Sequence, residues 1–377
     1  MRLWQKSGAV CDTRIAIAGD FLPPPDVPPD VATDWRQMGV DLANYIGEVD
    51  TAVLNLECCV DTVDCVPKLK LGLGDVFSAH RDVLDFPRAF GADVIGVANN
   101  HTYDYGQLGL DRTTDAIRSA GLTPIGMTRG LRELPSIAIR ELHSGQRVGF
   151  WAAACHLPEL ATSNRAGIEP AFLWRAKNAL STLNGHGSQI NIALLHAGME
   201  HTNYPDPFDV RLIDKIAMAG FDVVAAAHSH RVSGYKRLIR PGRGPAFCFY
   251  GLGSVCSSVL YSPLEQEGLI VVVGAEKSGE IAEVDLRFVQ LNDWGLGVIP
   301  CYSAFVAMRD RFARVSEDIR SGRYKGSFYA DVGTGLFHRQ FRDVRTALTR
   351  GGLNGLVQKL SRIRLRHFKR ALHSTLG

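Results

Sequence analysis

Side chains that bind metals recur at the ends of short apolar segments of this sequence. Five places share this arrangement: Gly19-Asp20, Asn55-Leu56-Glu57, Asn99-Asn100-His101, His196 and His228-Ser229-His230. Carboxylate oxygens, an amide oxygen and imidazole nitrogens together suit Mn, Fe or Zn, which accept oxygen and nitrogen ligands. We therefore interpret these places as parts of one metal centre.

Six of these side chains are the candidate metal ligands: Asp20, Glu57, Asn100, His196, His228 and His230. Six donors are enough for two divalent transition-metal ions, Mn, Fe or Zn. Two such ions about 3.5–4 Å apart can stabilise both the attacking and the leaving oxygen of a displacement and lower the pKa of a water between them. The pattern predicts hydrolysis, or acyl or phosphoryl transfer.

Each motif taken alone has a plainer interpretation. A single histidine at a strand end is more often structural than a ligand, and the His228-Ser229-His230 pattern by itself is a weak metal signal. Asn-Asn-His also fits a simple turn, because asparagine tolerates left-handed backbone conformations. The joint occurrence of all five places, each at a strand end, favours the metal centre.

The elements that must position these side chains are short, apolar and often β-branched, which is typical of buried strands. They are residues 14–18, 52–54, 93–97, 147–152, 191–195, 222–226, 246–250 and 269–273. Because the carboxyl ends of parallel strands meet at one edge of an open α/β sheet, we expect the five places to converge there.

Helical patterns lie between several of these strands, as at Leu108–Ala120 and Pro207–Ala219, and each ends at a glycine. Alternating strands and helices predict an α/β class. The later strands follow one another without helices, so part of the sheet should be antiparallel. Two stacked sheets flanked by helices fit this order. The proline-rich residues 21–30 predict a loop directly after Asp20.

Composition bounds the class of protein. The chain has 377 residues, of which 46% are hydrophobic and 21% are charged, so it can bury a large core and is not a disordered protein. The eight cysteines form no CxxC pair, and we expect mostly reduced thiols. No stretch approaches the roughly 20 apolar residues that span a membrane, and the N-terminus does not resemble an export signal. A cytoplasmic location is expected.

Charge is unevenly distributed along the chain. Residues 337–377 contain ten Lys or Arg and one acid, a net +9, which leaves the first 336 residues at −6 against a total of +3. Apolar residues recur in this tail at helical spacing, which predicts a basic amphipathic helix. The helix could dock on the acidic body of its own chain, lie on an anionic membrane surface, or contact a partner or anionic polymer. No module for specific nucleic-acid binding accompanies it.

Two longer segments resemble a known family. VLNLECCV, followed by ADVIGVANNHTYDYGQLGL, is similar to the N-x-E and A-N-N-H-x-x-D-x-G patterns of the CapA family, the bacterial capsule or poly-γ-glutamate synthesis proteins. LLHAGMEH, AAAHSH and FYGLGSV are similar to that family's later motifs, so the resemblance covers about residues 14–290. It implies the four-layer αββα sandwich of the calcineurin-like metallophosphoesterase superfamily.

The resemblance also implies a role for each residue. Glu57 would bridge both ions. The remaining ligands would divide between a first ion, bound by Asp20 and His230, and a second ion, bound by Asn100, His196 and His228. His101 would donate a proton to the leaving group, and Asp104 would orient His101 or shape the loop. The superfamily places a histidine two residues after its first aspartate, where this sequence has Leu22, so the first ion would have fewer ligands.

These inferences define two domains and two hypotheses. Residues 1–290 would form the catalytic domain, and residues 291–377 would form a basic, mainly helical extension. The first hypothesis is a dinuclear metal-dependent hydrolase, or acyl or phosphoryl transferase, acting on an anionic small molecule or polymer in capsule, poly-γ-glutamate, or small amide or peptide biosynthesis. The second is a non-catalytic component that binds an anionic polymer or an assembly partner.

Overall fold

The computed structural model describes residues 1–24, 34–67, 76–200, 202–258 and 262–332. The predicted basic helix at residues 337–377 lies outside the described residues. The chain divides into two compact units, Met1–Lys325 and Gly326–Gly377. No helix among the described residues is long and apolar enough to cross a membrane.

The first of two large sheets has nine strands. Their spatial order is β1 (Arg2–Gln5), β18 (Ile281–Leu291), β17 (Glu267–Ala275), β2 (Thr13–Leu22), β3 (Thr51–Leu56), β6 (Ala92–Gly96) and β7 (Thr123–Ile125), with β16 (Ser254–Ser257) beside β2 and β19 (Gly297–Val298) beside β18. β2, β3, β6 and β7 run parallel, whereas β17 is antiparallel to both β2 and β18. The predicted mixture of parallel and antiparallel strands is confirmed.

The second large sheet has six strands. Their order is β14 (Tyr235–Arg240), β15 (Arg243–Phe249), β13 (Val223–His228), β12 (Ile190–Ala197), β10 (Arg147–Ala154) and β9 (Ile137–Glu141). β10, β12, β13 and β15 are parallel, and an antiparallel strand closes each edge. Every residue of β12 is buried, as expected for a central parallel strand covered on both faces.

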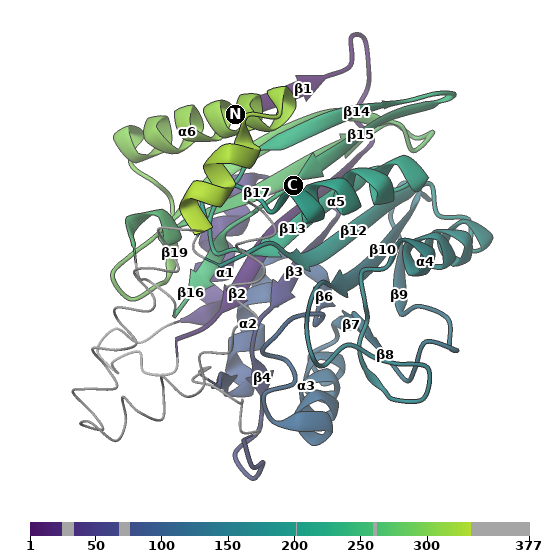
Figure 1. Cartoon of the computed structure of the whole chain (residues 1–377), viewed down its shortest axis with the longest axis vertical. Coiled ribbons are helices and arrows are strands. Elements are labelled where there is room, and N and C mark those ends of the chain that lie inside the picture. The colour runs from purple at the N-terminus through teal and green to yellow at the C-terminus, as the bar shows by residue number, and fades with distance from the viewer. Residues whose placement is uncertain (25–33, 68–75, 201, 259–261, 333–377) are drawn as a thin grey trace. The chain divides into compact units, whose positions relative to one another are not determined.

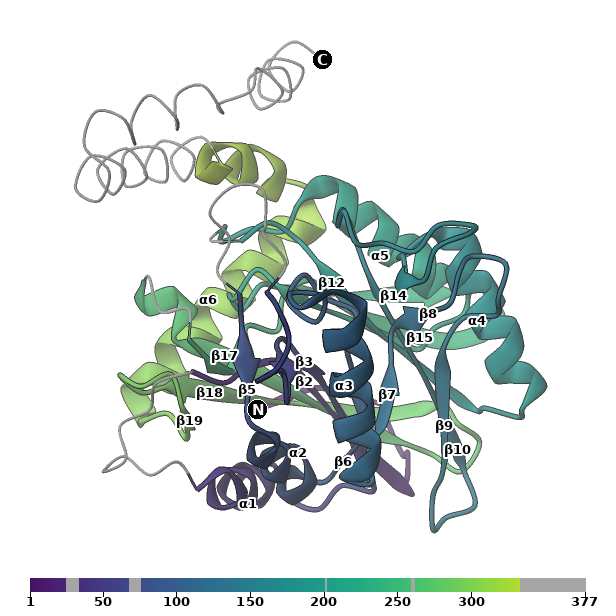
Figure 2. The same ribbon diagram turned by 90° about the horizontal axis from the view of Figure 1, so that it is seen from below.

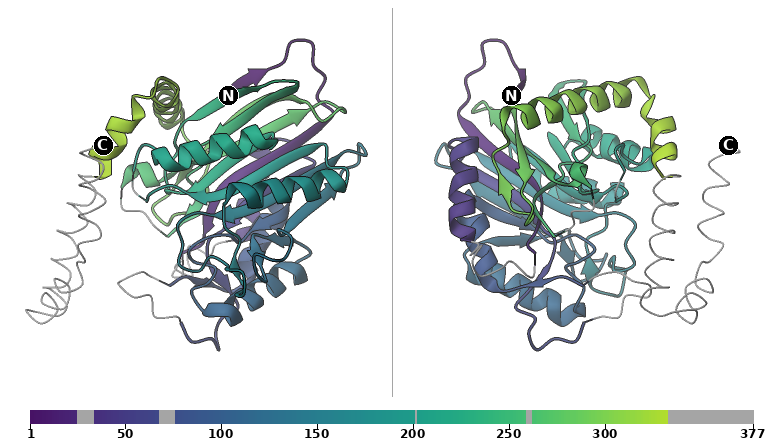
Figure 3. Two further views of the ribbon diagram at one scale, coloured as in Figure 1. Left: turned by 45° about the vertical axis from the view of Figure 1, so that its right-hand side comes forward. Right: turned by 90° about the vertical axis from the view of Figure 1, so that its left-hand side faces the viewer.

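Helices cover the outer face of each sheet. The first sheet packs against α1 (Trp35–Ile46), α2 (Asp85–Phe90) and α3 (Gly106–Ser119), and the second against α4 (Leu173–Gly185) and α5 (Pro207–Ala219). A third apolar core fills the space between the sheets. Figures 1 and 2 show this order of layers, and Figure 3 shows α4 and α5 side by side across the second sheet. The predicted four-layer αββα sandwich is confirmed.

Short elements complete the compact unit. They are the paired strands β4 (Cys59–Val60) and β5 (Ser78–Ala79), the paired strands β8 (Met127–Thr128) and β11 (Gly167–Ile168), and the 3₁₀ turns η2 (Arg81–Leu84) and η3 (Pro263–Glu265). The first pair lies in the connection between β3 and β6, and therefore next to the segment that follows Glu57.

The longest helix among the described residues is α6 (Tyr302–Ser321), in the region predicted to be a helical extension from residue 291 onward. Its Met308 and Phe312 belong to the core between the sheets, and Val315 and Ile319 belong to the outer core of the second sheet. Because these side chains are buried there, the compact unit runs to Lys325 rather than ending at residue 290. The functional division into a catalytic domain and a basic extension stays a prediction.

Local sequence explains where the elements begin and end. The Asp206 side chain accepts a hydrogen bond from the Phe208 amide, Pro207 fixes the first turn of α5, and Gly220 ends it, at the predicted bounds. One predicted boundary was wrong, since β2 continues past Asp20 to Leu22. Its last residues pair with β16, so part of the predicted loop is strand.

Candidate metal centre

The two large sheets bring the six candidate ligands to one place. Asp20 lies in β2 and Glu57 directly follows β3 in the first sheet, whereas His196 and His228 lie at the carboxyl ends of β12 and β13 in the second. β12 and β13 are in register there, with Ala197 opposite His228. The centre therefore forms where strand ends of two different sheets meet.

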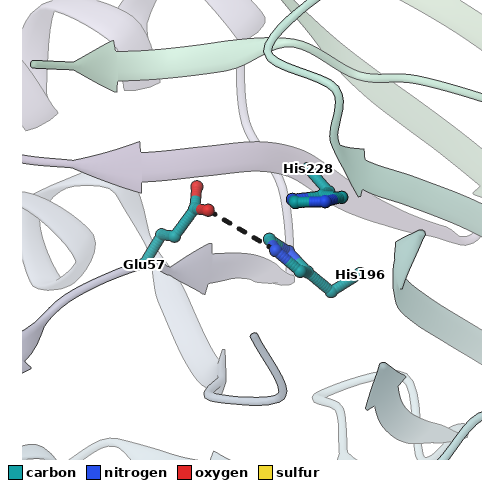
Figure 4. Close-up of side chains that lie close together, drawn as sticks. All are labelled: Glu57, His196 and His228. Carbon is teal, nitrogen blue, oxygen red and sulfur yellow. Dashed lines mark ion pairs between the residues drawn. The ribbon is translucent and has the colours of Figure 1, made fainter. Parts of the chain in front are cut away.

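Glu57 occupies the middle of this centre. Its carboxylate lies with His196 and His228 in one group, and with Asp20 and His230 in another, and within each group the ligand atoms lie within 4.8 Å of one another. Figure 4 shows the Glu57 carboxylate directed at His196, with the His228 ring beside it. One carboxylate shared by two groups is the arrangement of a bridging ligand.

Distances around Glu57 are short on both sides. Glu57 Oε1 lies 3.4 Å from His196 Nε2, and Glu57 Oε2 lies 3.9 Å from His230 Nδ1. His230 Nδ1 also lies 3.5 Å from Asp20 Oδ2. The Asp20 and Glu57 side chains have no solvent exposure, so two carboxylates share a closed space with imidazole rings.

Asn100 joins the group around His196. Its side-chain oxygen lies 2.6 Å from His196 Nε2, and the ring centroids of His196 and His228 are 4.3 Å apart. The structure thus brings together Asn100, His196 and His228, the three residues assigned to the second ion. Their role as ligands stays a prediction.

A buried chain of amides fixes the oxygen ligands. Asn55 Nδ2 donates to Asp20 Oδ1 at 2.7 Å, and Asn99 Nδ2 donates to Asn55 Oδ1 at 3.0 Å and to the Leu56 carbonyl at 2.7 Å. Asn99 Oδ1 accepts from the His101 amide at 3.0 Å. Asn99 therefore ties the loop that carries His101 to the strand that precedes Glu57.

His101 and Asp104 form the predicted pair. His101 Nδ1 lies 2.8 Å from Asp104 Oδ2, and that oxygen also accepts from the Phe77 amide at 2.8 Å. Asp104 is fully buried and the Phe77 ring stacks edge-on against the His101 ring, with centroids 4.5 Å apart. Because an ionised carboxylate can only accept a hydrogen bond, this contact favours the tautomer of His101 with a proton on Nδ1.

The histidines of the second sheet rest on an unusual backbone. His228 and His230 have φ angles of 106° and 54°, which are uncommon for residues other than glycine. The His228 amide donates to Asp20 Oδ2 at 2.9 Å, so this conformation ties the second sheet to the first. Outliers of this kind cluster at functional sites, where surrounding contacts maintain them.

Glycine allows the close approach that places Asp20. A side chain at Gly19 would collide with the carbonyl oxygen of Gly253, which accepts a hydrogen bond from the Asp20 amide at 3.0 Å. Two glycines, one in β2 and one before β16, therefore let the segments touch. Leu22, where the superfamily has a histidine, is fully buried and adds no donor.

The electrostatics of the centre fit divalent cations. Burial raises the pKa of Asp20 to about 6, against the hydrogen bonds from the His228 amide and Asn55 that lower it. Burial, and then the neighbouring His228, His230 and His101, lowers the pKa of His196 well below its usual value. A neutral imidazole offers a lone pair to a metal, and buried carboxylates gain from a cation. The donor set and its burial therefore suit bound metal ions.

Sequence reasoning missed the supporting residues. Asn55 and Asn99 belonged to the recognised motifs but received no role, although both lie one or two residues from a predicted ligand. A separate group, Cys155, His156 and Asp209, was not anticipated at all. Its signal was available, because Cys155 and His156 come within four residues of the end of the predicted strand at 147–152.

Comparison with known proteins identifies the family. The family described as "Bacterial capsule synthesis protein PGA_cap" matches residues 14–258, about two thirds of the chain and the whole segment from Asp20 to His230. The chain belongs to this family. The predicted membership in the CapA family is confirmed by a relative, the "Capsule biosynthesis protein CapA" of Bacillus anthracis, which is 25% identical over 183 residues.

That match covers 47% of this chain and 43% of the relative, so this chain matches less than half of the relative's length. Among solved structures, it is similar to the NAD nucleotidase NadN of Haemophilus influenzae, with a TM-score of 0.45 and 11% identity over 80% of this chain and 62% of that chain. It is also similar to the calcineurin-like phosphoesterase YfkN from Bacillus subtilis, with a TM-score of 0.45 and 14% identity over 82% and 99% of the two chains.

Proposed function

We propose that this member of the PGA_cap family is a dinuclear metal-dependent hydrolase, or a related acyl or phosphoryl transferase. The observation that carries the proposal is the position of Glu57. Its carboxylate belongs to both groups of candidate ligands, one with His196 and His228 and the other with Asp20 and His230. A structural role for a single buried glutamate does not require two histidine-containing groups around it.

The ligands and the residues that support them would have separate roles. The six candidate ligands would hold two ions, and bound ions of this kind supply Lewis-acid polarisation and a water of lowered pKa. Asn99 and Asn55 hold Asp20 and the segment before Glu57 in place through hydrogen bonds of 2.7–3.0 Å. Such supporting contacts orient ligands and sustain metal affinity.

His101 is proposed as the proton donor to the leaving group. The hydrogen bond between His101 Nδ1 and Asp104 Oδ2, at 2.8 Å, would keep the ring in one tautomer and one orientation. His101 is also mostly buried, so its ring is largely shielded from bulk water. General acid catalysis of this kind contributes roughly 10²–10⁴-fold to a rate.

The proposed substrate is anionic, a small molecule or a polymer, in capsule, poly-γ-glutamate or small amide metabolism. Two divalent ions make a centre that attracts phosphate or carboxylate groups. The family description and the Bacillus anthracis relative, both of which concern capsule synthesis, support this choice of substrate class. Contact with a membrane surface or a partner through the basic residues 337–377 stays a prediction, as does a cytoplasmic location.

The test is a metal-reconstituted activity screen. The full chain, loaded separately with Mn, Fe or Zn, is assayed on phosphomonoesters, phosphodiesters and γ-glutamyl amides. We expect turnover in one class, and we expect His101→Ala to lower kcat about 10²–10⁴-fold while keeping the metal content of the wild type. His143→Ala changes an exposed histidine and should leave both unchanged.

Two results would contradict the proposal. Fully loaded wild-type protein that turns over none of these substrates, yet binds poly-γ-glutamate, supports the non-catalytic alternative instead. A His101→Ala variant that loses metal but retains activity per bound ion would make His101 a ligand rather than the acid.

A further inference from the structure

A second group of metal-binding side chains lies on the other face of the same sheet edge. Ala154 ends β10 beside His196 of β12, and both the Ala154 side chain and the centre lie on the side of the first sheet. Cys155, the next residue, packs instead with the outer core beneath α5. His156 follows, and Asp209 lies in the first turn of α5.

The three side chains converge. The candidate ligand atoms of Cys155, His156 and Asp209 lie within 4.8 Å of one another, and His156 Nε2 is 3.1 Å from Asp209 Oδ1. Around a tetrahedral zinc ion, with ligand bonds of about 2.0–2.3 Å, donor atoms lie roughly 3–4 Å apart. The observed spacing therefore needs only small side-chain adjustments to close on an ion.

Burial and charge at this place favour a cation. The Asp209 side chain is 3% exposed, whereas the His156 side chain is 59% exposed, so a buried carboxylate faces an opening to solvent. Asp206, the N-cap of α5, interacts electrostatically with both Cys155 and Asp209. Two carboxylates beside a thiol and an imidazole gain from a divalent ion, because burial of a negative charge is costly without one.

The backbone also helps to position these side chains. His156 has a φ of 57°, a backbone conformation that is uncommon for residues other than glycine and that surrounding contacts must maintain. Asp209 Oδ2 accepts a hydrogen bond from the Gly198 amide at 2.9 Å, and the Cys155 amide donates to the His196 carbonyl at 2.9 Å. The group is therefore hydrogen-bonded to the segment that carries His196, at His196 itself and at Gly198.

We infer that Cys155, His156 and Asp209 form a separate mononuclear site for an ion of the zinc class, with the fourth position open to solvent. Thiolate, imidazole and carboxylate are all zinc ligands, and three protein ligands with one open position fit the half-exposed geometry. On binding, the Cys155 thiol gives its proton to solvent and the sulfur becomes a thiolate ligand. The site would fix the segment that carries His196.

Cobalt substitution tests this inference separately from the dinuclear centre. The dinuclear centre offers oxygen and nitrogen donors, so a near-ultraviolet thiolate-to-cobalt charge-transfer band reports a cysteine ligand. We expect the band in the full-length wild type titrated with Co²⁺, its loss in Cys155→Ser, and its weakening in His156→Ala, which changes an exposed side chain. Cys301→Ser removes an exposed thiol elsewhere and should keep the band.

The Glu57→Ala variant separates the two sites. It should keep the cobalt–thiolate band even though it lacks the ions of the dinuclear centre. The test of the Cys155 site therefore does not depend on whether the proposed function is correct. Zinc content should fall by one equivalent in Cys155→Ser and remain unchanged in Cys301→Ser. Absence of the band in wild type, or its persistence in Cys155→Ser, would overturn the inference.

Discussion

The two sheets supply chemically different halves of the centre. The first sheet contributes oxygen donors: Asp20 lies in β2, Glu57 directly follows the parallel strand β3, and Asn55 hydrogen-bonds to Asp20. The second sheet contributes nitrogen donors, and two of them, His228 and His230, rest on backbone with positive φ. Neither sheet alone holds both carboxylates and imidazoles.

This difference shows how the centre is assembled. The oxygen half is positioned by side-chain hydrogen bonds from asparagines, and the nitrogen half by a turn with positive φ that other contacts must maintain. Because the halves meet only when both sheets have stacked, bound ions should link the stability of one sheet to that of the other.

Removing Glu57, whose carboxylate lies in both groups of candidate ligands, should have the largest effect. Glu57→Ala deletes the one side chain present in both ligand groups, so we expect loss of both ions and of all metal-dependent turnover. Elemental analysis after gel filtration measures the ions. Glu141→Ala changes an exposed surface glutamate and serves as the control. A Glu57→Ala, Cys155→Ser protein that still retains one tightly bound ion would show that the two ligand groups bind independently.

The halves should also respond oppositely to pH in metal-free protein. The pKa of Asp20 is about 6 when folded and 3.8 ordinarily, so the folded state holds the extra proton between these values. Its contribution to the free energy of unfolding therefore falls by about 2 kcal/mol as pH rises from about 4 to 6. The lowered pKa of His196 acts the other way, adding stability as pH rises toward 6.5.

Asp20→Asn isolates the oxygen half in this experiment. In chelator, the stability of Asp20→Asn relative to wild type should increase by about 2 kcal/mol between pH 4 and pH 6, as measured by urea unfolding. A difference that stays constant with pH would mean that Asp20 titrates normally in the folded, metal-free protein.

Loosening the support of the oxygen half should have a smaller effect. Asn99→Ala removes the hydrogen bonds to Asn55 and to the Leu56 carbonyl, and we expect metal affinity to weaken by about 10–100-fold. Competition with a fluorescent chelator measures this affinity. Asn178→Ala, at an exposed position of α4, should bind like the wild type. Equal metal affinity of Asn99→Ala and Asn178→Ala would show that Asn99 does not support metal binding.

The smallest expected effect concerns the backbone of the nitrogen half. At His230, with φ of 54°, glycine should be more stable than alanine by about 1 kcal/mol in metal-free protein, because both lack the imidazole and only alanine is strained. At the neighbouring Ser229, which has no positive φ, the order should reverse. The same order at both positions in chemical denaturation would show that the turn is unstrained.

Sequence patterns predicted much of this molecule because its central strands are apolar and buried on both faces. The eight predicted strands and the bounds of α5 follow from such runs and from Asp206 and Gly220. β18 was missed because its charged residues interrupt the apolar pattern. Most of these residues are nevertheless buried, and they form ion pairs such as that of Asp285 with Arg2.

The candidate ligands were recognisable because each follows an apolar run, but their surroundings were not. The link from Asn99 through Asn55 to Asp20 joins three strands, and no local pattern reports such a contact. The sequence also does not predict the positive φ at His228 and His230, because histidine is not a residue that marks a turn. Cys155 and Asp209 meet only through the packing of α5 on β10.

The most direct test of the centre is anomalous diffraction from crystals of the metal-loaded full chain, with data at the absorption edges of Mn, Fe and Zn. We predict two anomalous peaks about 3.5–4 Å apart with the Glu57 carboxylate between them, one beside His196 and His228 and the other beside Asp20 and His230. A single peak, or two peaks that Glu57 does not contact, would contradict a dinuclear centre at the junction of the two sheets.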